Sequence, residues 1–152
     1  MSRIFVDSAA FIALHSATDR YAGVASNVYR RLVSDKRSLV TTNLVVAETC
    51  NLLNRLRNGY RITLDFRDFL AASGTAYVPG DLPALLPQKG IMRVYSTPSL
   101  ERRAWEIFAK YDTARFSFTD CVSFAVMEAL SIKQAFTFDE HYDVLGFERL
   151  PK

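Results

Sequence analysis

An α/β fold with a central, mainly parallel sheet is predicted for this chain by three observations. Short apolar runs begin near residues 3, 38, 91 and 134, and longer segments with helical spacing separate them. This alternation is typical of a parallel sheet covered by helices. With 152 residues, 49% of them hydrophobic, the chain is long enough to bury one core. We expect one domain over residues 1–152 and a sheet of four or five strands.

Helical spacing is clearest after the first strand, residues 4–6. Tyr21, Val24 and Val28 recur at intervals of three and four, and Asp19 precedes them as a candidate cap. In the same way, Thr42 and Asn43 end the second strand and offer caps for the helix that follows. The helices expected in this half of the chain cover residues 8–14, 19–33, 43–57 and 62–72.

The second half begins with a connection that contains Pro79, Pro83 and Pro87, which is expected to be irregular. After a strand over residues 91–95, Pro98 stands at the favoured first turn of a helix. The apolar stripe of that helix suggests that Trp105 lies in the core. Another helix opens at Ser117, and a strand over residues 134–138 follows it.

Composition limits the classes of protein to which this chain can belong. No run of about eighteen apolar residues is present, and the N-terminus lacks the pattern of a secretory signal. A soluble, cytoplasmic protein with no membrane partner is therefore expected. The two cysteines, Cys50 and Cys121, are too few for a disulfide framework and are expected to be reduced thiols. The net charge of +3 supports nucleic-acid binding only weakly.

Four acidic residues follow or open the predicted elements, namely Asp7, Glu48, Asp120 and Asp139. Each has an ordinary explanation on its own, such as helix capping by Asp120 or an ion pair of Glu48 with Arg55. Three of the four nevertheless fall at the edge where a parallel sheet places its ligands. Converging carboxylates repel one another, and hard divalent cations such as Mg²⁺ or Mn²⁺ relieve that repulsion. The pattern indicates a metal site.

At these positions the chain resembles the PIN-domain ribonucleases, and its length is similar to that of VapC-type toxins. The four blocks that carry the resemblance occur in the order of the family's acidic motifs. They are Arg3-Ile4-Phe5-Val6-Asp7-Ser8, Thr41-Thr42-Asn43-Leu44-Val45-Val46-Ala47-Glu48, Phe118-Thr119-Asp120-Cys121-Val122-Ser123-Phe124-Ala125 and Phe136-Thr137-Phe138-Asp139-Glu140-His141-Tyr142. Residues 145–147 resemble the closing strand of the family.

The resemblance implies a three-layer α/β/α sandwich and RNA cleavage that depends on Mg²⁺ or Mn²⁺. Asp7 and Asp120 would be the main metal ligands, and Glu48 and Asp139 would complete the acidic cluster, with Asp143 as a substitute for Asp139. It also implies an RNA substrate and a cognate antitoxin protein. The apolar stripes of the helices expected over residues 19–33 and 61–72 could form an interface, and we expect a homodimer. Three side chains would orient the carboxylates, those of Ser8, Thr119 and Thr137.

Two other functions remain open at this point. A phosphatase that uses Asp7 as its nucleophile normally carries a second aspartate two residues later, where this chain has Ala9. The PIN family often has asparagine or serine at the same position, so one polar contact is in doubt. A binding module that keeps the fold without activity is the other alternative. Surface roles are expected for His15 and His141 rather than catalysis.

Overall fold

A computed structural model of the chain describes residues 3–74, 76–79 and 90–152. Within these residues the strands form one sheet in the order β3-β4-β2-β1-β5-β6, and every pairing in it is parallel. The strands are β1 (Ile4–Val6), β2 (Leu39–Thr42), β3 (Ala76–Pro79), β4 (Ile91–Tyr95), β5 (Gln134–Phe136) and β6 (Glu148–Leu150).

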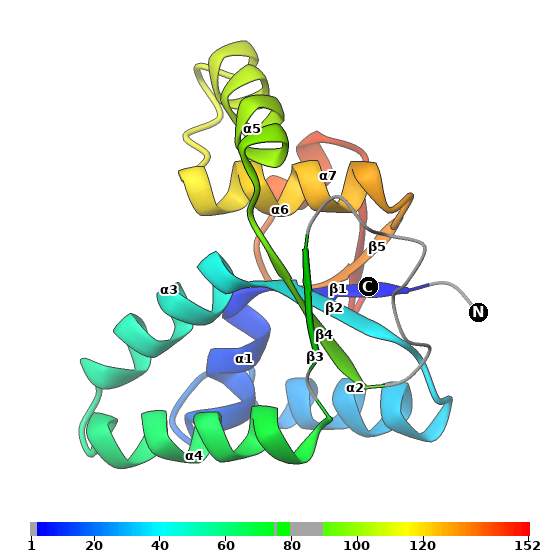
Figure 1. The fold of residues 1–152 in the computed structure, drawn as a ribbon. Helices are drawn as coiled ribbons and strands as arrows, with labels where there is room; N and C mark the ends of the chain where they lie inside the picture. The colour runs from blue at the N-terminus through cyan, green and yellow to red at the C-terminus, as the bar shows by residue number, and fades with distance from the viewer. Residues whose placement is uncertain (1–2, 75, 80–89) are drawn as a thin grey trace.

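Helices cover both faces of this sheet and produce three layers (Figure 1). Helices α1 to α4 lie on one face, and α6 and α7 lie on the other, with α5 packed against α6. The α/β class and the layered architecture expected from the sequence are therefore confirmed. The helices are α1 (Ser8–His15), α2 (Ala22–Ser34), α3 (Asn43–Asn54), α4 (Gly59–Ala72), α5 (Pro98–Lys110), α6 (Phe118–Ala129) and α7 (His141–Val144).

The central strand β1 is apolar along its whole length because helices cover it on both sides. Ile4, Phe5 and Val6 of β1 are at most 1% exposed. The buried polar residue Thr41 of β2 is satisfied locally, because its hydroxyl donates a hydrogen bond of 2.9 Å to the carbonyl oxygen of Val6. This hydrogen bond connects the carboxyl ends of β1 and β2, next to Asp7.

The sheet has six strands where the sequence led us to expect four or five. Strand β3 falls in the segment expected to be irregular, and its proline, Pro79, occupies the last position of an edge strand, where a missing donor is tolerated. The closing strand is residues 148–150 instead of 145–147, because Gly146 takes a left-handed turn with φ of 80°. The rest of the proline-containing connection, residues 80–89, lies outside the described residues.

Other boundaries also differ from the prediction. The Asp19 side chain accepts a hydrogen bond from the Tyr21 amide and closes a turn before α2, which begins three residues later than expected. Trp105 is 58% exposed and so does not belong to the core, although its ring packs against those of Phe108 and Phe118. None of the helices in the described part of the chain has the length and apolarity that a bilayer crossing requires.

Candidate metal centre

The direction in which the sheet grows reverses at β1, which lies between β2 and β5. In parallel α/β sheets such a reversal leaves a crevice outside the carboxyl ends of the strands, and ligands bind there. Asp7 directly follows β1, and Thr137 to Asp139 follow β5. Backbone topology therefore brings two of the four predicted acids to one crevice.

A cleft of about 330 Å³ occupies this position, and all four predicted acids line it. Asp7 comes from the end of β1, Glu48 from the middle of α3, Asp120 from the first turn of α6 and Asp139 from the loop before α7. Ala9 also lines the cleft, so a methyl group stands where a phosphatase would carry its second aspartate. The remaining lining residues are Ser8, Ile12, Leu52, Arg115, Ser117 and His141.

Asp7 is the most deeply buried of the four, at 2% exposure. Its Oδ2 accepts a hydrogen bond of 2.9 Å from the Thr137 hydroxyl, whereas its buried Oδ1 has no hydrogen-bond partner among the described residues. Burial, with additional repulsion from Asp120 and Asp139, raises the pKa of Asp7 from 3.8 to about 7, although hydrogen bonds from Thr137 and Ser8 oppose the shift. Thr137 thus orients Asp7, the contact expected from the sequence.

Glu48 faces the cleft from α3, with its side chain held by a neighbouring helix. The Ser8 hydroxyl donates a short hydrogen bond of 2.6 Å to Oε2 of Glu48. The sequence left open that Glu48 is an ordinary charge paired with Arg55. Among the described residues the two side chains form no ion pair. The orienting contact expected of Ser8 is present.

Asp120 helps to cap the start of α6 and also lines the cleft. Its Oδ2 accepts a 3.1 Å hydrogen bond from the Ser117 amide, and its own amide donates a 3.0 Å hydrogen bond to Ser117 Oγ, which completes a capping box. Burial first, then the charges of Asp139 and Glu48, raise the pKa of Asp120 against the opposing effects of Ser117 and His141. Thr119, expected to orient a carboxylate, makes no side-chain hydrogen bond to these acids in the described region, and Ser117 holds Asp120 instead.

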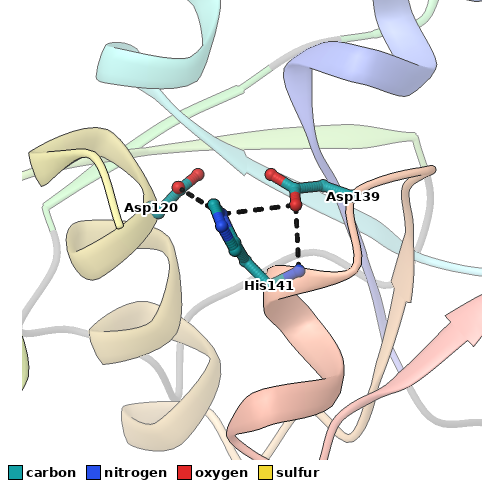
Figure 2. Close-up of side chains that lie close together, drawn as sticks. All are labelled: Asp120, Asp139 and His141. Atoms are coloured by element: carbon teal, nitrogen blue, oxygen red, sulfur yellow. Dashed lines mark hydrogen bonds and ion pairs between the residues drawn. The ribbon is translucent and has the colours of Figure 1, made fainter. Parts of the chain in front are cut away.

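Asp139 and His141 complete the cleft from the loop and first residue of α7 (Figure 2). The His141 amide donates a 2.9 Å hydrogen bond to Asp139 Oδ1, and the Asp139 amide donates one of 3.1 Å to Thr137 Oγ1. The imidazole Nδ1 of His141 lies 3.3 Å from Asp139 Oδ1 and 3.5 Å from Asp120 Oδ2. The surface role expected for His141 was therefore wrong, because the fold brings the ring between two carboxylates.

The donor set fits a divalent cation. One ligand atom from each of Asp120, Asp139 and His141 lies within 4.8 Å of the other two. A buried carboxylate oxygen without a partner, such as Asp7 Oδ1, is costly in free energy unless a proton or a cation satisfies it. The thiol of Cys121, next to Asp120, contributes no charge, because burial raises its pKa to about 11. Both cysteines are free, as expected.

Three polar residues that line the cleft were not predicted from the sequence to belong to the site. Arg115 lines the cleft with a left-handed backbone, φ of 57°, a conformation that is uncommon for a long side chain. Ser117 was recognised only as the start of a helix. His141 stands two residues after Asp139, and this spacing was the signal that could have shown it beside the acids. The second histidine, His15, is half-buried against Phe66 and Phe69, which also differs from a surface role.

Comparisons with known proteins agree with this geometry. The PIN domain family matches residues 4–148 of the chain. The 23S rRNA-specific endonuclease VapC20 of Mycobacterium tuberculosis, from strains H37Rv and CDC 1551 / Oshkosh, is 34% identical over 146 residues, and the match covers 95% of each chain. The crystal structure of Mycobacterium tuberculosis VapC20, a Sarcin-Ricin loop cleaving toxin, is similar with a TM-score of 0.74, 31% identity and 95% coverage of both chains.

The chain therefore belongs to the PIN-domain family, as a VapC-like endoribonuclease toxin. Its acidic cluster is that of a metal-dependent nuclease.

Proposed function

We propose that this chain hydrolyses phosphodiester bonds of RNA with Mg²⁺ or Mn²⁺ held by Asp7, Asp120 and Asp139, with Glu48 completing the acidic cluster of the cleft. The observation that carries this proposal is the unpartnered buried oxygen of Asp7 in a cleft that three further carboxylates line. A divalent cation in this position would lower the pKa of a water nucleophile and stabilise charge on the leaving oxygen.

The chain's own residues supply orientation. Thr137 holds one oxygen of Asp7, while Ser8 fixes Glu48 and the Ser117 amide fixes Asp120. Carboxylates held in this way lose little conformational entropy when a cation binds. A carboxylate without a cation contact would serve as the proton acceptor for the attacking water.

Positive charge near the cleft favours a polyanionic substrate. Arg115 lines the cleft itself, and Arg55 and Arg57 are exposed just after α3, the helix that contributes Glu48. Guanidinium groups bind phosphate oxygens in a bidentate manner. By analogy with VapC20, whose name specifies 23S rRNA, we infer that ribosomal RNA is the target.

Similarity to the VapC20 toxin supports a cognate antitoxin as the partner. We further propose that the chain forms one nuclease domain over residues 1–152 and that two copies of it associate as a homodimer. Exposed apolar side chains suited to such contacts are Val24 and Val33 on α2 and Trp105 and Phe108 on α5. Light scattering over a wide concentration range should give twice the chain mass. A monomer at every concentration would remove the homodimer from the proposal.

The central test compares Asp120→Asn with Asp65→Asn in a cleavage assay on total RNA. Asp65 is an exposed aspartate that pairs with Arg61 on α4, away from the cleft. Loss of a metal ligand removes several kcal/mol of transition-state stabilisation, so Asp120→Asn should cleave at least about a thousandfold more slowly, while Asp65→Asn should cleave normally. Circular dichroism should report the same fold for both.

Two outcomes would contradict the nuclease proposal. Full activity of Asp120→Asn, or of the unmodified chain in excess chelator, would remove the metal from the reaction. Intact RNA together with no binding of Mg²⁺ or Mn²⁺ at millimolar concentration would favour the alternative of a binding module without activity.

A further inference from the structure

The imidazole of His141 is not among the proposed metal ligands, although His141 lines the cleft. Figure 2 shows its ring between the carboxylates of Asp120 and Asp139, with contacts from Nδ1 to both. Nδ1 is buried and makes no hydrogen bond with either carboxylate, although both lie within 3.5 Å of it. A nitrogen so close to two carboxylate oxygens without hydrogen-bond geometry requires another explanation.

Packing fixes this ring before any ligand arrives. The neighbouring residue Tyr142 is fully buried and packs edge to face against Phe124, which anchors the short helix α7 in the core. The Phe116 ring packs edge to face against the imidazole itself, at a centroid distance of 5.3 Å. The backbone amide of His141 is tied to Asp139. A preorganised ring of this kind is characteristic of a ligand more than of a mobile surface histidine.

We propose that Nδ1 of His141 coordinates the divalent cation together with Asp120 and Asp139, so that the site prefers Mn²⁺ to Mg²⁺. This inference rests on the proposed function, because it concerns the same cation. Ligands about 2.1 Å from an octahedral cation lie about 3.0 Å apart when adjacent. The observed separations of 3.3 and 3.5 Å from Nδ1 require only a small contraction to reach that value.

The choice between cations follows from ligand chemistry. Mg²⁺ is bound almost entirely through oxygen, and imidazole nitrogen suits first-row transition metals better. The unpartnered Oδ1 of buried Asp7 is independent evidence that a cation belongs in this cleft. The competing explanation is that the carboxylates alone hold the cation and that the His141 ring only packs beside Asp120 and Asp139. In that case the nitrogen would not contact the cation.

Pulsed electron paramagnetic resonance on the full chain with one equivalent of Mn²⁺ separates these explanations, because it detects nitrogen bound directly to the ion. The chain contains two histidines, so a nitrogen coupling has only two candidate imidazole sources. We expect the coupling in the unmodified chain and in His15→Ala, and its loss in His141→Ala. Titration should show Mn²⁺ affinity at least about tenfold weaker in His141→Ala, with Mg²⁺ affinity changed less than about twofold.

The outcomes that overturn this inference are distinct from failure of the nuclease proposal. If Mn²⁺ binds the unmodified chain without nitrogen coupling, His141 is not a ligand, and the nuclease proposal stands on its carboxylates. If Mn²⁺ does not bind the unmodified chain at all, this inference falls, whereas the nuclease proposal falls only if Mg²⁺ also fails to bind and RNA stays intact. The measurement on the unmodified chain does not depend on any variant folding, and His141→Asn provides a second variant should His141→Ala be unstable.

Discussion

Two hollows at opposite ends of the sheet differ in what lines them. The cleft at the carboxyl ends holds about 330 Å³ and contains the four acids. The other holds about 450 Å³ and lies beside Leu39 and Ile91, the first residues of β2 and β4. Its lining is mainly apolar and includes Tyr29, Val33 and Phe69. The larger hollow is therefore the one without a cluster of acids.

The difference shows that strand direction, and not volume, locates the chemistry. Carboxyl ends of parallel strands and amino ends of helices meet at the same edge of the sheet, and the partial positive charge of a helix start favours carboxylates there. Asp120 lies in the first turn of α6, at that edge. The amino-end hollow has Leu39 and Ile91 buried in its wall instead, so we expect substitutions there to change stability and not metal binding.

The largest effect in this comparison is expected at Asp139, for which the sequence left Asp143 open as a substitute. Asp139 lines the cleft, whereas Asp143 is exposed and pairs with Arg149 through two contacts of 2.9 Å. Asp139→Asn should slow RNA cleavage by about a hundredfold or more, because it removes a proposed ligand. Asp143→Asn should cleave normally in the same assay. Equal rates for the two variants would contradict the assignment of Asp139.

A smaller effect is expected at the opposite end of the sheet. Ile91 is 1% exposed, so Ile91→Ala should lower the free energy of unfolding by about 3 kcal/mol. Val33 lines the same hollow but is 55% exposed, and Val33→Ala should cost less than about 1 kcal/mol. Urea unfolding measures both, and calorimetric titration should give unchanged Mn²⁺ affinity. Weaker metal binding by folded Ile91→Ala would show that the two ends are coupled.

The smallest expected effect is a pH dependence that belongs to the acidic end alone. The pKa of Asp7 is about 7 in the folded chain and 3.8 ordinarily, so the folded state binds more protons than the unfolded state between these values. Without metal, the free energy of unfolding should therefore fall as pH rises through this window, by on the order of 2 kcal/mol between about pH 5.5 and pH 8. Mn²⁺ should restore the lost stability at the higher pH.

The control for this pH dependence is Asp7→Asn, which cannot ionise. Urea unfolding of the metal-free variant should show a clearly smaller decrease over the same pH range. An identical decrease in both proteins would mean that another group is responsible, and that Asp7 is not neutral at low pH in the way its burial requires.

Local patterns in the sequence accounted for much of the fold. The strand over residues 91–95 and the helix that Pro98 opens are present, as is the helix expected to open at Ser117. Two other short-range signals were wrong. Asp19 closes a turn ahead of the helix that it was expected to cap, and Trp105 lies on an exposed face although its helix has a buried stripe.

The candidate site, like the fold, was predicted only in part from the sequence. Three of the four acids were identified from their place after a strand or at the start of a helix, and Glu48 from the apolar run that precedes it. The orienting partners were only partly identified, because a hydrogen bond such as Ser8 to Glu48 joins residues forty positions apart. His141 was misjudged, since a turn in the sequence gives no sign that Tyr142 will anchor it against the core.

The sequence by itself determined the α/β class, the order of the elements and the four carboxylates, because periodicity and residue type are local properties of the chain. Tertiary structure alone decided the edge strand β3, the burial of Asp7 and the position of His141 between Asp120 and Asp139. These features depend on which distant segments pack together. Burial and neighbouring charge, which set the chemistry of a carboxylate, arise only from that packing.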